Sequence, residues 1–174
     1  THMPLSAVSA SITRKRVEYT VRTAVDSLGE NLGLKNLRVG ICGLNPHAGE
    51  RGLLGLEDRD EIAPAVAGLR SEGVDCQGPM GAESAFMAAR AGELDLVVAM
   101  YHDQGLAPLK AVDFGRSVNW SMGLPILRVS VDHGTADDLV GSGRADPSSM
   151  AAAIQLAQEI LRYRTANERV EPRD

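Results

Sequence analysis

Apolar residues along this chain recur with two different spacings, and the two alternate from one end of the sequence to the other. Apolar side chains three or four positions apart predict a helix with one buried face, and short apolar runs predict strands. The helical spacing marks residues 13–33, 57–72, 82–91, 103–112 and 147–164. Strands are predicted at residues 38–42, 74–77, 95–100, 117–122 and 126–131. This alternation predicts an α/β/α sandwich with a mostly parallel sheet.

Four residues mark where these helices begin, end or bend. Thr13 suits the cap of the first helix, and Gly73 stands where a glycine commonly follows the last turn of the second helix. Pro147 suits the first turn of the last helix. Pro64 falls inside the second helix, where a proline bends or breaks the backbone hydrogen bonding.

The composition is that of an ordinary folded protein. The 174 residues are 44% apolar and 24% charged, which excludes disorder, collagen and coiled coil and fits one domain, or one domain with a piece of another. A net charge of −5, without a run of Lys or Arg, argues against nucleic-acid binding. No apolar stretch reaches the roughly 18–20 residues of a membrane span, and no signal-peptide layout is present. The protein is therefore expected to be cytoplasmic, with Cys42 and Cys76 as buried free thiols.

Three histidines follow the ends of predicted strands, which is where open α/β sheets bind ligands. His47, His102 and His133 each come within a few residues of such an end, whereas His2 precedes the first helix. A single loop histidine is more often a surface or structural residue. Three of them together indicate a metal site, since histidine is the commonest ligand of Zn²⁺ and similar ions.

Polar residues around two of these histidines add to that prediction. The segment Gly43–Glu50 holds two glycines and a proline, which restrict the loop and let a ligand approach the backbone. Tyr101–Gly105 places four hydrogen-bonding side chains at the mouth of a strand. The alternative is a simple helix entry that Asp103 caps. Lys110 lies two helical turns beyond Asp103, so a cation could share that rim.

Several common cofactor and nucleophile motifs are absent from the sequence. There is no G-x-G-x-x-G between a strand and a helix, no G-x-x-x-x-G-K-[ST] and no G-x-S-x-G. A nucleotide or phosphate site must therefore use other groups. Asn119 and Arg128 lie on or near two predicted strands, and arginine suits phosphate or carboxylate binding, with a surface ion pair as the alternative role.

Four segments follow one another along the chain: Gly43–Glu50, Ala99–Gly105, Gly123–Pro125 and Asp132–Ala136. Together they resemble the 4-hydroxythreonine-4-phosphate dehydrogenase family of pyridoxal phosphate biosynthesis. The same signatures occur in paralogues that act on four-carbon sugar-acid phosphates. Thr1–Leu5 lacks an initiator Met, which alone fits a cloning remnant or the interior of a longer chain. It resembles an internal segment of the family, which implies the second half of a protein about twice as long.

The resemblance implies an incomplete fold of the isocitrate and isopropylmalate dehydrogenase type. Residues 1–135 would form a metal- and substrate-binding α/β domain that lacks its N-terminal part. Residues 136–174 would form a helical segment that packs on the missing other domain. In the family, the first half supplies a further His-Thr pair for the substrate, so activity of this chain alone stays open.

The resemblance also implies a role for each candidate site residue. His2, His47 and His102 match the family's three ligands of a divalent metal (Zn, Co or Mg), the third being supplied across the interface of a homodimer. The positions that match the binding site of the phosphorylated substrate are Lys110, Asn119 and Arg128. The positions that resemble the NAD or NADP loop are His133, Gly134, Thr135 and Ala136.

The implied reaction is oxidation of the secondary alcohol of 4-phosphooxy-L-threonine by hydride transfer to the nicotinamide, followed by decarboxylation. A metal lowers the pKa of such an alcohol and stabilises the enolate that decarboxylation leaves. Asp103 or Lys110 would relay the alcohol proton, unless Lys110 only binds the substrate. Two alternatives stay open. One is a paralogous threonate or erythronate 4-phosphate dehydrogenase, and the other is a non-catalytic, metal-binding fragment that dimerises.

Overall fold

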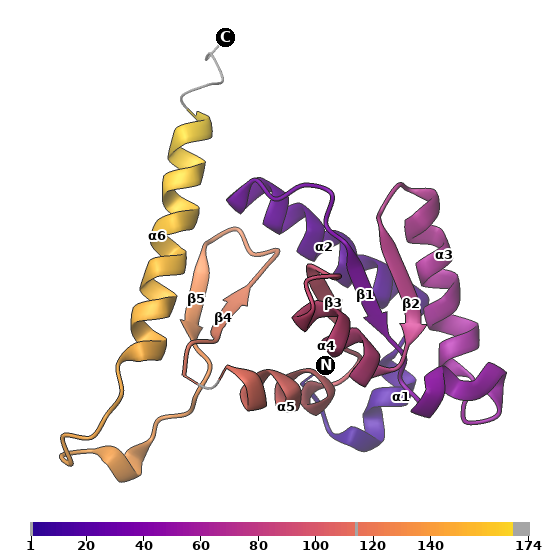
Figure 1. Ribbon diagram of the computed structural model, residues 1–174, viewed down its shortest axis with the longest axis horizontal. Helices are drawn as coiled ribbons and strands as arrows, with labels where there is room; N and C mark the ends of the chain where they lie inside the picture. The colour runs from indigo at the N-terminus through magenta and orange to yellow at the C-terminus, as the bar shows by residue number, and fades with distance from the viewer. Residues whose placement is uncertain (1, 114, 169–174) are drawn as a thin grey trace. The chain divides into compact units, whose positions relative to one another are not determined.

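The structure is a computed structural model that describes residues 2–113 and 115–168 (Figure 1). The chain divides into two compact units. Unit 1 combines Thr1–Val25 with Lys35–Pro108, and unit 2 combines Asp26–Leu34 with Leu109–Asp174. The domain boundary predicted at residue 135 stays a prediction.

Unit 1 is built around a parallel sheet of three strands in the order β2-β1-β3. The central strand β1 (Val39–Cys42) is buried along its whole length. It pairs in parallel with β2 (Cys76–Met80) and with β3 (Leu96–Val98). The carboxyl ends of the three strands therefore meet at one edge, as the sequence predicts.

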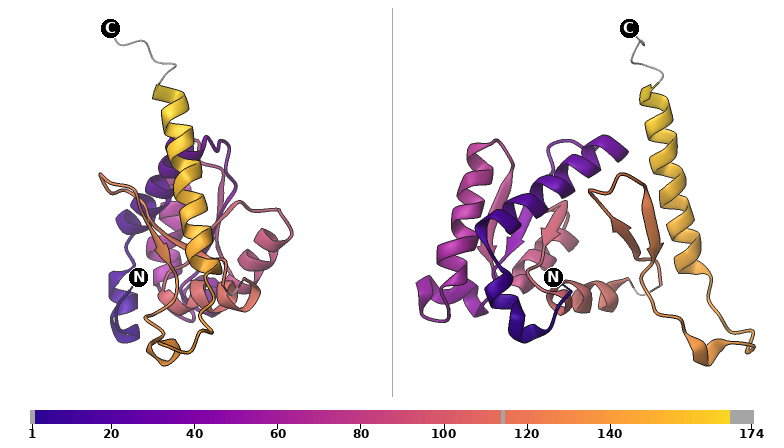
Figure 2. Two further views of the ribbon diagram at one scale, coloured as in Figure 1. Left: turned by 90° about the vertical axis from the view of Figure 1, so that its left-hand side faces the viewer. Right: turned by 180° about the vertical axis from the view of Figure 1, so that it is seen from behind.

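Helices cover both faces of this sheet, which confirms the predicted α/β/α layers in unit 1. Figures 1 and 2 show α4 (Ala82–Arg90) on one face and α2 (Arg14–Leu32) on the other. The main core lies on the α2 side, where α3 (Ala63–Ser71) also packs. Its fully buried members include Val21 from α2, Val39 and Ile41 from β1, Leu69 from α3, and Ile62 just before α3.

Short helical turns precede two of the helices. The chain begins with a 3₁₀ turn, η1 (Leu5–Ala7), and one helical turn, α1 (Val8–Ser11). The Thr13 hydroxyl accepts a hydrogen bond from the Arg16 amide at 3.3 Å, which confirms the predicted cap of α2. A single π-helical turn, η3 (Asp58–Ile62), leads into α3. The backbone hydrogen bonding changes from π-helical to α-helical next to Pro64, because proline has no amide hydrogen to donate.

Unit 2 contains an antiparallel hairpin and a long helix. α5 (His102–Val112) crosses from unit 1 into unit 2, and the hairpin β4 (Val118–Ser121) with β5 (Arg128–Val131) follows it. A 3₁₀ turn, η4 (Asp137–Leu139), precedes α6 (Ser148–Glu168), which contacts both strands of the hairpin. The guanidinium of Arg164 donates to the Asn31 side chain at 2.6 Å and so joins α6 to the end of α2.

The structure corrects three boundaries of the predicted elements. The weak strand predicted at residues 74–77 is instead Cys76–Met80, and its Pro79 is tolerated because β2 lies at an edge of the sheet. The single helix predicted over 57–72 begins as the π turn described above. The last helix continues to residue 168 rather than 164. No helix among the described residues is long and apolar enough to cross a membrane.

A bidentate ion pair joins the segments that lead into β1 and β3. Arg38 donates to the two oxygens of Asp95 at 2.8 and 2.9 Å, and its backbone amide adds a bond of 2.9 Å. These donors, the Arg38 side chain above all, lower the pKa of Asp95 to about 2. A carboxyl whose pKa is lowered by folding stabilises the fold above its unfolded pKa, and this contribution is lost as the pH falls through the folded value.

We therefore expect the stability advantage of the wild type over Asp95→Asn to be constant near neutral pH. It should shrink as the pH falls from about 4 towards 2, because both states then protonate the carboxyl. Urea unfolding of the two proteins over this pH range measures the difference. An advantage that stays the same down to pH 2 would contradict the assigned ion pair.

Candidate functional site

The loop that follows β1 has an unusual left-handed backbone. It runs through Gly43–Asn45 into the 3₁₀ segment η2 (Pro46–Gly52). Within η2, five consecutive residues from His47 to Arg51 have φ between 42° and 74°. Four of the five are not glycine, and a left-handed conformation costs an ordinary residue roughly 1–2 kcal/mol. Such a run persists only when its surroundings hold it.

The carboxylate of Asp58 supplies much of that support. Asp58 is 1% exposed, and its Oδ1 accepts the Leu44 amide at 2.8 Å. Its Oδ2 accepts the Asn45 amide at 3.1 Å and the Asn45 side-chain amide at 2.9 Å. Hydrogen bonds to a charged group contribute about 1.5–3 kcal/mol each, which is comparable to the cost of the left-handed residues. The loop therefore folds around a buried negative charge.

A second carboxylate extends this network to the start of the chain. Glu57 accepts a hydrogen bond from the Asn45 side chain at 2.9 Å and one from the hydroxyl of Ser9 on α1. These donors, Ser9 first, lower the pKa of Glu57 below its usual value. The network thus joins α1, the loop after β1 and the turn that leads into α3.

Two of the predicted metal ligands lie together in unit 1. The ring centroids of His2 and His102 are 4.9 Å apart, with their planes inclined by 39°. An oxygen of Asp103 lies 2.7 Å from Nδ1 of His102. A carboxylate on one ring nitrogen fixes the tautomer and leaves the other nitrogen for a ligand. Asp103 lies inside the first turn of α5, so its carboxylate contacts His102 rather than the backbone amides it would cap.

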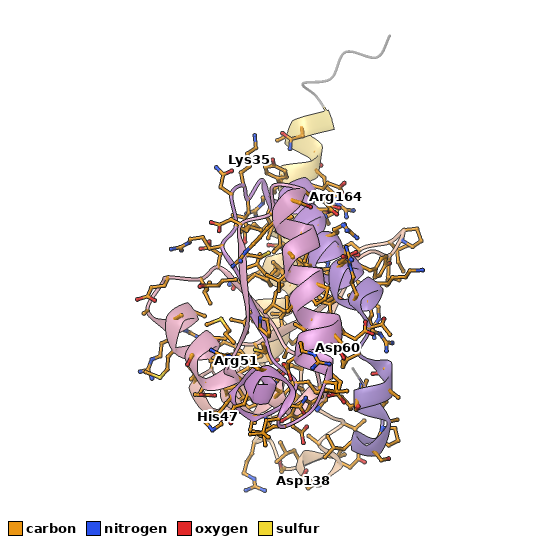
Figure 3. All side chains as sticks on the ribbon, turned by 90° about the vertical axis from the view of Figure 1, so that its right-hand side faces the viewer. Lys35, His47, Arg51, Asp60, Asp138 and Arg164 are labelled. Atoms are coloured by element: carbon orange, nitrogen blue, oxygen red, sulfur yellow. The ribbon has the colours of Figure 1, made fainter. Side chains whose placement is uncertain are left out.

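His47 lies apart from this pair. Across residues 2–113 and 115–168, no three His, Cys, Asp or Glu side chains come close enough to hold a metal within one chain. Figure 3 shows the His47 side chain at the outer edge of its loop. There it lines a cavity of about 400 Å³ at the carboxyl edge of the sheet, together with Asn45, Glu83, Tyr101 and Gln104.

Gln104 ties the ends of β1 and β3 together at this edge. Its side-chain oxygen accepts the Met100 amide, and its side-chain nitrogen donates to the Gly43 carbonyl, both at 2.7 Å. One side chain thus holds the loop that carries His47 to the segment that carries His102. Of the four polar residues at 101–104, Tyr101 and Gln104 line the cavity at this edge.

The predicted cofactor loop lines a second cavity, which lies in unit 2. This cavity of about 680 Å³ is bordered by His133–Ala136, Lys110, Asp132 and Ser149 in the first turn of α6. The Lys110 ammonium donates to the Asp132 carbonyl at 2.7 Å and lies 3.0 Å from the Asp132 carboxylate. The contact between Lys110 and the Asp132 carboxylate is an ion pair, but it does not have the geometry of a hydrogen bond. The Lys110 ammonium therefore faces a cavity large enough for a nucleotide-sized ligand.

Asn119 and Arg128 share one face of the hairpin. Ser121 pairs with Arg128 and Asn119 with Ser130, and alternate residues of a strand point to the same face. Arg128 donates to the Ser121 hydroxyl at 2.8 Å. Among the described residues Arg128 forms no ion pair, so its alternative role as an ion-pair partner has no support here.

The two cysteines are buried and free, as predicted. Burial raises the pKa of the Cys42 thiol to about 11, and it also raises the pKa of Cys76. Thiols of this kind are unreactive near neutral pH. Neither cysteine therefore belongs to the candidate site.

Sequence reasoning missed the residues that hold the site in place. Asp58, Glu57 and Ser9 carry no motif, and the acidic run 57–61 has the composition of a solvent-exposed helix start. The one available signal was the pair of glycines in Gly43–Glu50, since positions without Cβ indicate a close approach by another group.

Comparison with known proteins identifies relatives of this chain. The family described as "Pyridoxal phosphate biosynthetic protein PdxA" matches residues 1–157. A protein of Stenotrophomonas maltophilia (strain K279a) named 4-hydroxythreonine-4-phosphate dehydrogenase is 49% identical over 165 residues. That alignment covers 95% of this chain and 51% of the relative. The chain thus spans about half the length of the curated relatives it matches.

Solved structures show the same likeness. The crystal structure of 4-hydroxythreonine-4-phosphate dehydrogenase from Klebsiella pneumoniae aligns with a TM-score of 0.80 and 43% identity, over 91% of this chain and 48% of that one. A terephthalate 1,2-cis-dihydrodiol dehydrogenase from Burkholderia xenovorans LB400 aligns with a TM-score of 0.72 and 37% identity, over 89% and 49%. The fold is therefore shared by dehydrogenases that are named for different substrates.

Proposed function

The chain belongs to the PdxA family of pyridoxal phosphate biosynthetic proteins, and we propose that the whole protein of which it forms about half is a 4-hydroxythreonine-4-phosphate dehydrogenase. In this proposal it oxidises the secondary alcohol of 4-phosphooxy-L-threonine with NAD or NADP and then decarboxylates the product. The observation that carries the proposal is the match over residues 1–157, which contains all the candidate site residues.

The charges of unit 2 support a phosphorylated substrate. Lys110 faces the 680 Å³ cavity, and Arg128 and Asn119 share one face of the hairpin. Ammonium and guanidinium groups are the common protein partners of phosphate. We assign these three residues to the substrate.

The same cavity supports binding of a nicotinamide cofactor. Its loop His133–Ala136 supplies backbone groups in place of the missing glycine motif, and η4 and the start of α6 border it. A nicotinamide accepts a hydride and thereby oxidises an alcohol carbon. The proposal also includes a cytoplasmic location, because two buried free thiols suit a reducing compartment.

The residues of unit 1 fit a divalent metal in part. His2 and His102 supply two adjacent imidazoles, and the Asp103 carboxylate orients the second of them. Imidazole ligands favour Zn²⁺ or Co²⁺ over Mg²⁺, which prefers oxygen. A bound metal would act as a Lewis acid that lowers the pKa of the substrate alcohol and stabilises negative charge after decarboxylation.

We propose that His47 of a second copy completes this site in a homodimer. Within one chain His47 is not near the pair, and the same loop region exposes three leucines. Leu53, Leu54 and Leu56 are 77%, 42% and 51% exposed. Neighbouring exposed leucines often mark an interface between proteins. Dimerisation would cover them and carry His47 to the partner's imidazole pair.

Two groups of this chain are placed to move the alcohol proton. Asp103 contacts a ligand histidine and is exposed, so it can accept a proton and pass it to water. Lys110 is held by Asp132, which suits a fixed charge that binds the substrate. We therefore assign the proton to Asp103 and substrate binding to Lys110.

One specific observation favours a second candidate function, which is oxidation of a related alcohol. The Burkholderia xenovorans neighbour is named for a dihydrodiol, and its fold aligns over 89% of this chain. The paralogues that the sequence also resembles make threonate or erythronate 4-phosphate the competing substrates. A non-catalytic, metal-binding fragment that dimerises is the third.

The complete protein separates these proposals in one assay. Absorbance of the reduced nicotinamide at steady state would be recorded with 4-phosphooxy-L-threonine, threonate 4-phosphate and erythronate 4-phosphate, each with NAD and with NADP. We expect the highest kcat/KM with 4-phosphooxy-L-threonine. A higher value with either sugar-acid phosphate selects the paralogous function, and no turnover with any of them selects the non-catalytic fragment.

A shared metal site predicts complementation between inactive partners. Zinc content after dialysis should fall in His47→Ala and in His102→Ala, because each removes a ligand. Mixing the two unfolded variants and refolding them together should restore part of the zinc, since a mixed dimer contains one intact set of ligands. Elemental analysis measures the content. Unchanged zinc in both variants would show that the ligands are assigned wrongly.

Substrate binding by Lys110 predicts a loss that depends on the phosphate. Charge-assisted contacts contribute about 1.5–3 kcal/mol, so Lys110→Ala in the complete protein should lower kcat/KM by about ten- to a hundredfold. The loss should be smaller for an analogue without phosphate. Steady-state kinetics with both substrates tests this. Equal losses would assign Lys110 to the chemical step instead, and no loss would make it a surface charge.

A further inference from the structure

We propose that Asp58 is a positioning residue that sets the orientation of His47. Asp58 touches neither His47 nor the cavity that His47 lines, and it acts through the backbone of the loop. The inference rests on the proposed function in one respect, namely that His47 is a metal ligand. The orientation of His47 itself can be measured without a metal.

A series of hydrogen bonds connects Asp58 to the turn that contains His47. Its two oxygens hold the amides of Leu44 and Asn45. The Asn45 carbonyl in turn accepts the Ala48 amide at 3.1 Å, so the turn that contains His47 closes on the residue that Asp58 fixes. One buried side chain therefore determines where the left-handed run begins.

The loop leaves room for this carboxylate at two glycines. A Cβ on Gly43 would lie 2.5 Å from Oδ1 of Asp58, and a Cβ on Gly49 would lie 3.1 Å from Oδ2. Gly49 also has φ of +74°, which disfavours any side chain. The glycines before and after His47 thus both face the carboxylate, so the loop and Asp58 fit each other as a unit.

A purely structural role is the competing explanation, since Asp58 is buried and its loss is expected to destabilise the protein. Two variants separate the roles. Asp58→Asn removes the charge and replaces one acceptor with a donor. Gly49→Ala keeps the carboxylate but pushes against it. Asp60→Asn is the matched control, because Asp60 is an exposed neighbour that pairs only with Arg59 among the described residues.

The first readout is the NMR spectrum of the histidine rings in the metal-free protein. Each of the four histidines gives two ring cross-peaks, Cδ2–Hδ2 and Cε1–Hε1, in a carbon–proton correlation spectrum, and the Cε1–Hε1 peaks are followed here. We expect the His47 peak to shift or broaden in Asp58→Asn and in Gly49→Ala, while the His133 peak of unit 2 stays in place. Asp60→Asn should move neither peak. Both variants are compared at temperatures where circular dichroism shows them folded.

The second readout is zinc affinity, measured by competition with a chromophoric chelator. We expect Asp58→Asn to weaken zinc binding at least tenfold in the wild-type background. In a His47→Ala background the same substitution should have less than a twofold effect, because residues that act through one ligand are not additive. A merely structural role would weaken binding equally in both backgrounds.

The two readouts distinguish failure of this inference from failure of the proposed function. If the His47 peak stays at its wild-type position in both folded variants, Asp58 does not position His47 and the inference is overturned. If the peak moves but His47→Ala leaves zinc affinity unchanged, positioning is confirmed and the ligand assignment fails. If one of the two variants does not fold, the other still tests the inference. Gly49→Ala in particular retains every hydrogen-bonding group of Asp58.

Discussion

A buried negative charge beside the end of the central strand governs how the candidate site of unit 1 is built. The Asp58 carboxylate has lost nearly all its water, and an ion in that position is stable only when donors surround it. Backbone and side-chain amides from Leu44 and Asn45 are those donors. The chain must therefore turn tightly after β1, and the turn forces the left-handed run that presents His47 at the surface.

The parallel sheet places this loop next to the segment that follows β3, because it brings the ends of β1 and β3 to the same edge. The segment after β3 carries His102 at the first position of α5, and Gln104 bonds it to the loop after β1. His2 arrives from the N-terminal segment, which Ser9 and Glu57 attach to the same network. The histidines therefore depend on long-range polar contacts rather than on one local motif.

Sequence patterns predicted the parts of this arrangement that depend on residues close together in the chain. Amphipathic spacing located α2, α4 and α5, and the rule that ligands bind at carboxyl edges singled out His47 and His102. The same reasoning could not find Asp58, because a buried carboxylate and an exposed one look alike in an acidic run, and only the tertiary fold decides which is which. It also placed β2 too early, since Gly78 and Pro79 interrupt any alternating pattern. Spacing along the chain likewise does not tell which of the three histidines lie close together in the fold.

In the proposed function, the choice of substrate depends on different residues from the choice of reaction. The proposed metal and nicotinamide would be held by imidazoles and by the loop His133–Ala136. A neighbour named for a terephthalate dihydrodiol keeps the fold at 37% identity, so the fold itself does not demand a phosphate. Under the proposed function, discrimination would come from groups that meet the rest of the substrate, such as Lys110 and Arg128 in unit 2. Each charge-assisted contact with a substrate anion contributes about 1.5–3 kcal/mol, so a substrate without that anion would bind more weakly.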